Sequence, residues 1–333
     1  MKKKICIYLV PALLFASLLR ADDRPGSVPR SVRDPERLLA MGRADDAIGT
    51  LQQRISNNQR DAQAWNLLSR VYLGEEQWDK AVDAGEKAVA LAPNSSEYHL
   101  WLGRAYGEKA DHISHVNFIA AIRLARRTHA EFQRAVDLQP NSVAAQSDLG
   151  EFLLEAPGIA GGSVDKAQRV QQQLAALDPP TGHWLQARLA EKANRNEQAE
   201  REYHAAIDSS SNKAPYWLNL ASYLRRNNRL DEMEAAIQQA VAMSNRADSI
   251  LMDAAELLVR TDRNFTTAGK FLRQYLSTTQ PVEADPAFQA HYLLGSIFEK
   301  QGDRASAAAE YRNALQLASS YTPAQEGLRR LGQ

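Results

Sequence analysis

Arginine recurs at one register of this chain, directly after a small residue, and aromatic or amide side chains accompany it. Three arginines, two tryptophans and an asparagine, with a tyrosine further along the chain, form the set Asn66, Arg70, Trp101, Arg104, Trp184, Arg188 and Tyr292. Arginine binds carboxylates through paired hydrogen bonds, and arginine and tryptophan are enriched where interfaces concentrate their binding energy. We therefore expect these seven residues to bind a partner that carries carboxylates. The alternative is that they are ordinary solvated residues of helix surfaces, because the same register holds Glu151 and Glu256 in other repeats.

Other residues are weaker candidates for an anion-binding site or a metal site. The glycines of Gly158–Gly162 could bind an anion through their amides, but the loop lacks the G-x4-G-K-[ST] order of a phosphate loop. Asp111, His112, His115 and His129 could supply metal ligands, or they could be ordinary residues of a loop or helix start. The sequence has no H-E-x-x-H, no G-x-S-x-G and no dinucleotide-binding glycine pattern. We therefore predict no catalytic residue, no metal and no cofactor.

A helical-hairpin pattern that returns about every 34 residues must position these side chains. Its clearest copy, over residues 62–95, consists of Trp65, Leu68, Ser69, Tyr72, Ala81, Ala88 and Pro93. It returns as Leu102, Gly103, Tyr106, Phe132, Ala135 and Pro140, and near the C-terminus as Leu294, Gly295, Phe298, Ala307, Tyr311 and Ala314. The small residues let the two helices of a unit approach, and the large residues fill the space to the next unit. Neighbouring units then share one continuous core.

This pattern resembles the tetratricopeptide repeat template, W-x2-L-G-x2-Y followed by A-x3-F and P, over residues 35–321. Residues 152–162 also look like a segment of uncharacterised exported bacterial tetratricopeptide proteins. The resemblance implies an all-α fold, a right-handed α-solenoid of about eight helix hairpins with a capping helix over 322–333. It further implies protein or peptide binding in a groove lined by the first helix of each unit.

Two segments depart from the repeat. In the third unit the second helix arrives 13 residues late, which predicts an inserted or extended helix over about 107–127. Its apolar residues Phe118, Ile119 and Ile122, with three nearby arginines, could lie on a membrane, clasp a partner or pack on the solenoid's own core. In the fourth unit, a loop over 156–163 separates the two helices.

The N-terminus has the pattern of a secretory signal peptide. Lys2–Lys4 precede an apolar run, Ile5–Leu19, and cleavage is expected after Ala21. An uncleaved membrane anchor and a buried cytoplasmic helix are the alternatives. Residues 22–34 are expected to form a flexible leader. Because Cys6 is the only cysteine, the processed chain would have no thiol, no disulfide and no cysteine ligand for zinc.

Charge argues against nucleic acid as a partner. The whole chain has 40 basic and 40 acidic residues. Removal of residues 1–21, which hold four basic residues and no acid, leaves 36 basic and 40 acidic residues, a net charge of −4. A nucleic-acid-binding face would need a basic excess.

These patterns together favour a non-enzymatic scaffold that is exported to the periplasm or secreted, and that binds a protein or peptide. Envelope assembly and secretion are the candidate roles for such a scaffold. One alternative is an enzyme or enzyme subunit whose site is built by the segments 107–127 and 156–163. Another is a membrane-tethered adaptor, in which contact with a membrane requires that the N-terminal segment is retained.

The signal-peptide interpretation is tested by N-terminal sequencing of the protein from its native host. We expect a chain that starts after Ala21, in an exported fraction. A chain that starts at Met1 in the cytosol would contradict export, and one that starts at Met1 in the membrane would support the anchor.

Overall fold

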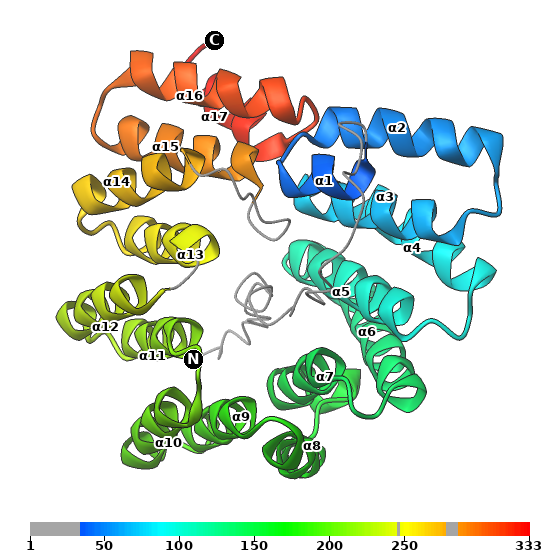
Figure 1. The fold of residues 1–333 in the computed structure, drawn as a ribbon, viewed down its shortest axis with the longest axis vertical. Coiled ribbons are helices and arrows are strands. Elements are labelled where there is room, and N and C mark those ends of the chain that lie inside the picture. The colour runs from blue at the N-terminus through cyan, green and yellow to red at the C-terminus, as the bar shows by residue number, and fades with distance from the viewer. Residues whose placement is uncertain (1–33, 245–246, 278–285) are drawn as a thin grey trace. The chain divides into compact units, whose positions relative to one another are not determined.

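The computed structural model describes residues 34–244, 247–277 and 286–333, so the expected signal peptide and nearly all of the expected leader lie outside it. The secondary structure of these residues is entirely helical (Figure 1). The α-helices are α1 Pro35–Ala40, α2 Ala44–Asn57, α3 Ala62–Gly74, α4 Trp78–Leu91, α5 Ser96–Ile113, α6 Phe118–Leu138, α7 Val143–Glu155, α8 Val164–Leu177, α9 Pro179–Lys192, α10 Asn196–Ser209, α11 Ala214–Arg226, α12 Leu230–Met243, α13 Ala247–Arg260, α14 Phe265–Leu276, α15 Ala287–Lys300, α16 Arg304–Leu317 and α17 Thr322–Arg330.

In the described ranges the first sixteen α-helices pair in chain order as eight hairpins, from α1 with α2 to α15 with α16. This confirms the prediction of an all-α solenoid with about eight hairpins. The last helix, α17, packs on α16 and α15 in the range expected for the capping helix. None of the helices in the described ranges is long and apolar enough to cross a membrane.

The described residues form two compact units. Unit 1 contains residues 60–70 and 78–210, which hold most of α3 and all of α4 to α10. Unit 2 contains residues 34–59, 71–77 and the described residues from 211 to 333, which hold α1, α2 and α11 to α17.

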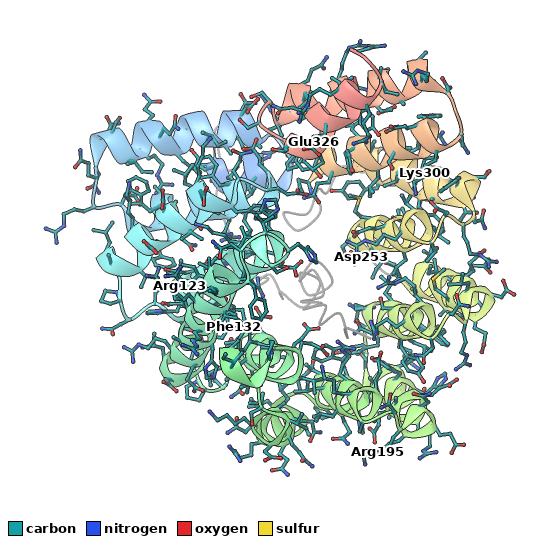
Figure 2. The ribbon with its side chains drawn as sticks, turned by 180° about the vertical axis from the view of Figure 1, so that it is seen from behind. Arg123, Phe132, Arg195, Asp253, Lys300 and Glu326 are labelled. Carbon is teal, nitrogen blue, oxygen red and sulfur yellow. The ribbon has the colours of Figure 1, made fainter. Side chains whose placement is uncertain are left out.

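Close approach of the two helices in a hairpin depends on a residue that has no side chain. In α5, a Cβ atom at Gly103 would lie 2.5 Å from the ring of Phe132, which Figure 2 labels on α6. In α15, a Cβ atom at Gly295 would lie 2.6 Å from the ring of Tyr311 on α16. Tyr311 is fully buried, and its hydroxyl donates a hydrogen bond to Glu299. Since the ring is held on several sides, it cannot move aside cheaply.

The segment over 107–127 corrects one expectation. It contains no separate inserted helix; instead α5 has 18 residues and α6 has 21, while the other helices from α2 to α16 have 12 to 14. The reason is that apolar periodicity continues along α6, where Ala121, Ile122 and Ala125 are buried against the hairpin's own core. The extra residues therefore lengthen both helices of one hairpin, which the sequence had allowed as the extended alternative.

Within unit 2, residues of the first two hairpins contact the last repeat and the turn after it. The carboxylate of Asp45 at the start of α2 accepts hydrogen bonds from the amide and hydroxyl of Ser319, both at 3.0 Å. The side-chain amide of Gln77 donates to the carbonyl of Ser320 at 2.8 Å, and that of Gln289 donates to the carbonyl of Gly74 at 3.1 Å. Residues from opposite ends of the sequence thus stabilise one unit.

The glycine contacts predict opposite effects for two alanine substitutions. Gly295→Ala should lower the free energy of unfolding by about 1–3 kcal/mol, the usual cost of overpacking, because the new Cβ meets Tyr311. Gly49→Ala in α2 should raise it by about 0.5–1 kcal/mol, because a Cβ there meets no atom within 4 Å and alanine favours the helix. Urea unfolding followed by circular dichroism measures both, and equal effects would contradict the packing argument.

Candidate partner-binding site

Three residues of the predicted set meet on the first helices of two neighbouring repeats in unit 1. Two guanidinium groups lie over the indole of Trp101 on α5, with the Cζ of Arg70 at 4.7 Å and that of Arg104 at 4.6 Å from its ring centroid. Cations over the faces of an indole are attracted by its quadrupole. The structure therefore holds both arginines in fixed positions relative to Trp101.

We call Arg70, Arg104 and Arg188, together with the charged side chains that pair with them, the row. A carboxylate of the protein itself pairs with Arg70, the first arginine of the row. Arg70 Nη1 donates to Glu97 Oε1 at 3.2 Å, and the side-chain amide of Asn66 donates to the same oxygen at 3.4 Å. Asn66 is buried and the Arg70 side chain is 13% exposed, but the Glu97 side chain is 56% exposed. Two buried or half-buried donors thus point at one acceptor that lies largely in solvent.

The second arginine forms a buried ion pair with the next repeat. Arg104 Nε lies 2.6 Å from Asp148 Oδ2 on α7, and the two side chains are 9% and 7% exposed. Breaking such a pair from one side is strongly destabilising, because it leaves a charge buried without its partner. This pair fixes α5 against α7.

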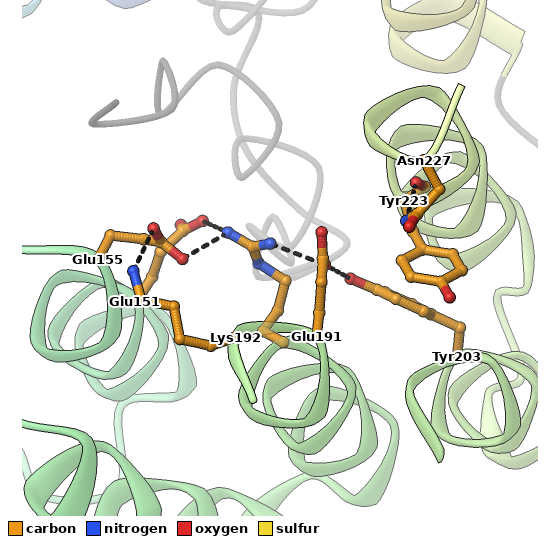
Figure 3. Close-up of polar contacts among 8 residues, drawn as sticks. Glu151, Glu155, Glu191, Lys192, Tyr203, Tyr223 and Asn227 are labelled. Atoms are coloured by element: carbon orange, nitrogen blue, oxygen red, sulfur yellow. Dashed lines mark hydrogen bonds and ion pairs between the residues drawn. The ribbon is translucent and has the colours of Figure 1, made fainter. Parts of the chain in front are cut away.

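The third arginine, Arg188, lies in a cage of three carboxylates, those of Glu151, Glu155 and Glu191, which Figure 3 labels. The guanidinium of Arg188 on α9 lies 3.8 Å from Glu151, 3.0 Å from Glu155 and 3.0 Å from Glu191. Tyr203 donates its hydroxyl to Glu191, and Lys192 also pairs with Glu155. Burial opposes the charge of Arg188, but Tyr203 and the three carboxylates outweigh that effect and raise its pKa above the usual range.

The two remaining aromatic residues do not join this group. Trp184 on α9 is only 3% exposed, so it contributes to the interior of unit 1. Tyr292 belongs to unit 2, where its ring lies 5.8 Å from that of Tyr311 and 5.6 Å from that of Tyr321. The structure thus collects six of the seven residues in unit 1 and places Tyr292 in the other unit. Binding of a partner by these residues stays a prediction.

The carboxylates that pair with the arginines were the part that sequence reasoning missed. Asp148, Glu151 and Glu155 are spaced by three and four residues, so they lie on one face of α7. That spacing, on the helix that follows Arg104 and precedes Arg188, is the signal that could have found them.

Backbone amides of the glycine loop, residues 156–163, donate hydrogen bonds to carbonyls of the protein itself. Its central turn is a 3-10 helix, Gly158–Ala160, in which the amides of Gly161 and Gly162 donate to Gly158 and Pro157. The next amide, of Ser163, donates to the carbonyl of Leu153 at 2.7 Å. The described loop is therefore a turn that closes on itself, and these amides are engaged rather than directed at an anion.

The candidate metal ligands do not converge either. His129 stacks on Phe152 with ring centroids 5.6 Å apart, and burial, followed by the charge of Lys166, lowers its pKa. His112 instead lies near Trp78, at 5.9 Å. Across the described ranges, no three His, Cys, Asp or Glu side chains are grouped so that they could hold a metal ion.

The hairpins and their shared core define a helix-hairpin repeat protein. Comparison with known protein families gives the same class. The tetratricopeptide repeat family matches residues 36–96, 185–249 and 276–322, more than half of the chain. The chain belongs to the tetratricopeptide repeat family, whose fold is that of a scaffold for protein or peptide binding. No curated protein matches the chain.

The chain is also similar to solved structures at low identity. Yeast Tom70 is 16% identical over 92% of this chain and 67% of its own, with a TM-score of 0.50. The thermophilic tetratricopeptide protein TTC0263 of Thermus thermophilus is 22% identical over 57% of this chain and 97% of its own, with a TM-score of 0.47. MamA is 20% identical over 56% and 99%, with a TM-score of 0.42.

The cage around Arg188 predicts a large loss of stability on truncation. Arg188→Ala removes the guanidinium shared by Glu151, Glu155 and Glu191 and leaves Lys192 paired with Glu155, so we expect a loss of about 3–5 kcal/mol in the free energy of unfolding. Arg201→Ala is the control, because its side chain is 71% exposed and its change should stay within about 0.5 kcal/mol. Urea unfolding of both variants measures this, and similar losses would show that the cage is not structural.

Proposed function

We propose that this protein is an exported tetratricopeptide scaffold that binds a protein or peptide segment through a carboxylate, at Asn66 and Arg70 beside Trp101. One observation carries the proposal: Asn66 and Arg70 already hold a carboxylate oxygen, that of Glu97, from an exposed side chain. Glu97 stands in for the ligand's carboxylate in the free protein. The pattern of residues 1–21 supports export, and a role in envelope assembly or secretion would follow from that location.

The ion pairs of the row differ in whether a ligand can replace them. Glu97 is 56% exposed, so a ligand carboxylate that takes its place leaves Glu97 solvated and keeps the 13% exposed Arg70 paired, and the exchange costs little. Displacement of Asp148 from Arg104 would instead leave a 7% exposed carboxylate without its cation, at a cost of about 3–5 kcal/mol. The same holds for the carboxylates around Arg188, whose side chains are 15–20% exposed. Recognition therefore centres on Arg70, and Arg104 and Arg188 position the helices.

Charge along the row supports a local rather than a distributed site. The row has four cations, Arg70, Arg104, Arg188 and Lys192, and five acids, Glu97, Asp148, Glu151, Glu155 and Glu191. A ligand rich in acids along its whole length would meet these carboxylates and be repelled. A segment with one carboxylate near an apolar group, for contact with Trp101, fits the row better.

Two substitutions should change peptide affinity in opposite directions. Peptides selected on the purified protein from a phage-displayed library are titrated by calorimetry. Arg70→Ala should weaken binding about tenfold or more, since a hydrogen bond to a charged group contributes about 1.5–3 kcal/mol. Glu97→Ala should strengthen binding, because the internal competitor is gone.

Arg201→Ala serves as the matched control on α10, the second helix of its hairpin, and should leave affinity unchanged. Circular dichroism confirms the fold of each variant. Failure to select any peptide would count against the binding function itself. Peptides that bind with the same affinity to all variants would place the site elsewhere on the protein.

A further inference from the structure

The turn between α5 and α6 reaches beyond the neighbouring hairpins of unit 1. Compared with the 14-residue helices α4 and α8 of the neighbouring hairpins, α5 is four residues longer and α6 is seven residues longer. At 1.5 Å per residue these extensions correspond to about 6 Å and about 10 Å of additional helix. The residues that join the two helices therefore stand at the tip of an elongated hairpin.

The tip is apolar and exposed. Val116 is 90% exposed, Ile119 is 72% exposed and Phe118 is 49% exposed, and all three lie within four consecutive residues. The neighbouring Asn117 caps α6, since its side chain accepts a hydrogen bond from the amide of Ala120 at 3.0 Å. The cap fixes the start of the helix, so these apolar side chains are presented by an ordered turn.

The flank of the same hairpin is cationic. Residues 112–130 contain no Asp or Glu, and they hold three arginines. Arg123 and Arg126 follow Ile119 by four and seven residues, which places all three on one face of α6. Arg126 also donates to the carbonyl of Ile159, whose side chain is itself 60% exposed. One face thus runs from apolar residues at the tip to two arginines and a further apolar residue.

The nearby charged groups leave this flank positive. Arg127 pairs with Glu86 at 3.0 Å and with the hydroxyl of Tyr106 at 3.1 Å, so it is engaged with α4 and α5. Asp111, the acid that precedes the tip, is partly buried, and burial raises its pKa against the opposing effect of His115 and His112. Neither acid offsets Arg123 and Arg126.

We propose that the α5–α6 tip binds the surface of a bilayer that contains anionic lipids. Val116, Phe118 and Ile119 enter the interface between headgroups and acyl chains, and Arg123 and Arg126 contact lipid phosphates. Apolar burial combined with attraction to anionic headgroups is the usual basis of interfacial binding. This surface is separate from Asn66, Arg70 and Trp101, and the inference does not depend on the proposed peptide site.

A lipid surface fits this tip better than a folded protein does. A stable protein interface buries about 800 Å² on each partner, well beyond what three side chains at a convex turn provide. A partner protein would also need a cavity shaped to receive them. A bilayer deforms around protruding side chains, and its anionic headgroups match the acid-free flank.

Sedimentation with vesicles tests the proposal. The purified full-length protein should bind vesicles with one quarter phosphatidylglycerol in phosphatidylcholine about tenfold or more tightly than vesicles of phosphatidylcholine alone. Val116→Ser with Ile119→Ser should remove most of this binding, and Arg123→Gln should weaken it about fivefold, as expected for one arginine near an anionic surface. Leu91→Ser with Leu177→Ser, at other exposed apolar positions, and Arg201→Gln are the controls and should bind as the wild type does.

A probe at the tip separates its binding from that of residues 1–21, which are apolar in part. An environment-sensitive fluorophore is attached through Val116→Cys in a Cys6→Ser background, and through Leu177→Cys as the control. Anionic vesicles should shift the emission to the blue at position 116 and leave position 177 unchanged. No shift at 116, or equal vesicle binding by the wild type and the tip variant, would overturn the proposal. If the tip variant binds vesicles as the wild type does but no longer binds a soluble partner protein, the tip is a protein-docking surface and the proposal is overturned.

Discussion

The structure depends on the contact between a small residue of one helix and a large side chain of another. Gly103 lies against Phe132 and Gly295 against Tyr311, each within a hairpin, while Gly150 lies against Leu185 of the following repeat. An added Cβ at any of these glycines would come within 2.6 Å of the facing side chain, so the helix spacing is set by the absence of a side chain. Because interiors are packed to the density of crystals, this spacing then determines which neighbouring side chains meet.

The charged row follows from that spacing. The arginines that follow the small residues are largely removed from water, with side chains that are 13% exposed at Arg70, 9% at Arg104 and 6% at Arg188. An arginine at that position must then find an acid, as Arg104 finds Asp148 and Arg188 finds Glu151, Glu155 and Glu191. Only at Arg70 is the acid exposed, because Glu97 lies in the first turn of α5. One repeated register therefore yields buried ion pairs in two repeats and, in a third, an ion pair whose acid is exposed.

The long α5–α6 hairpin also follows from helix packing, but there the packing leaves apolar side chains exposed. Ile122, Ala125 and Phe132 continue the buried stripe of α6, so the helix extends rather than ending and restarting. The buried stripe begins at Ala121, three residues after the start of α6. Phe118 and Ile119, which continue the apolar pattern in the sequence, are consequently exposed in the structure.

The sequence by itself determined the class of fold, the approximate hairpin count and the small residues at which helices meet, because these follow from local periodicity and from the size of individual residues. It also placed the candidate residues on the first helices of the repeats. The tertiary structure decided which of them pair internally, because Glu97, Asp148 and Glu155 reach their arginines from other helices, at sequence separations of 27 to 44 residues. It also decided that Asp45 meets Ser319, 274 residues away, since such a contact depends on accumulated helix packing that no local pattern records.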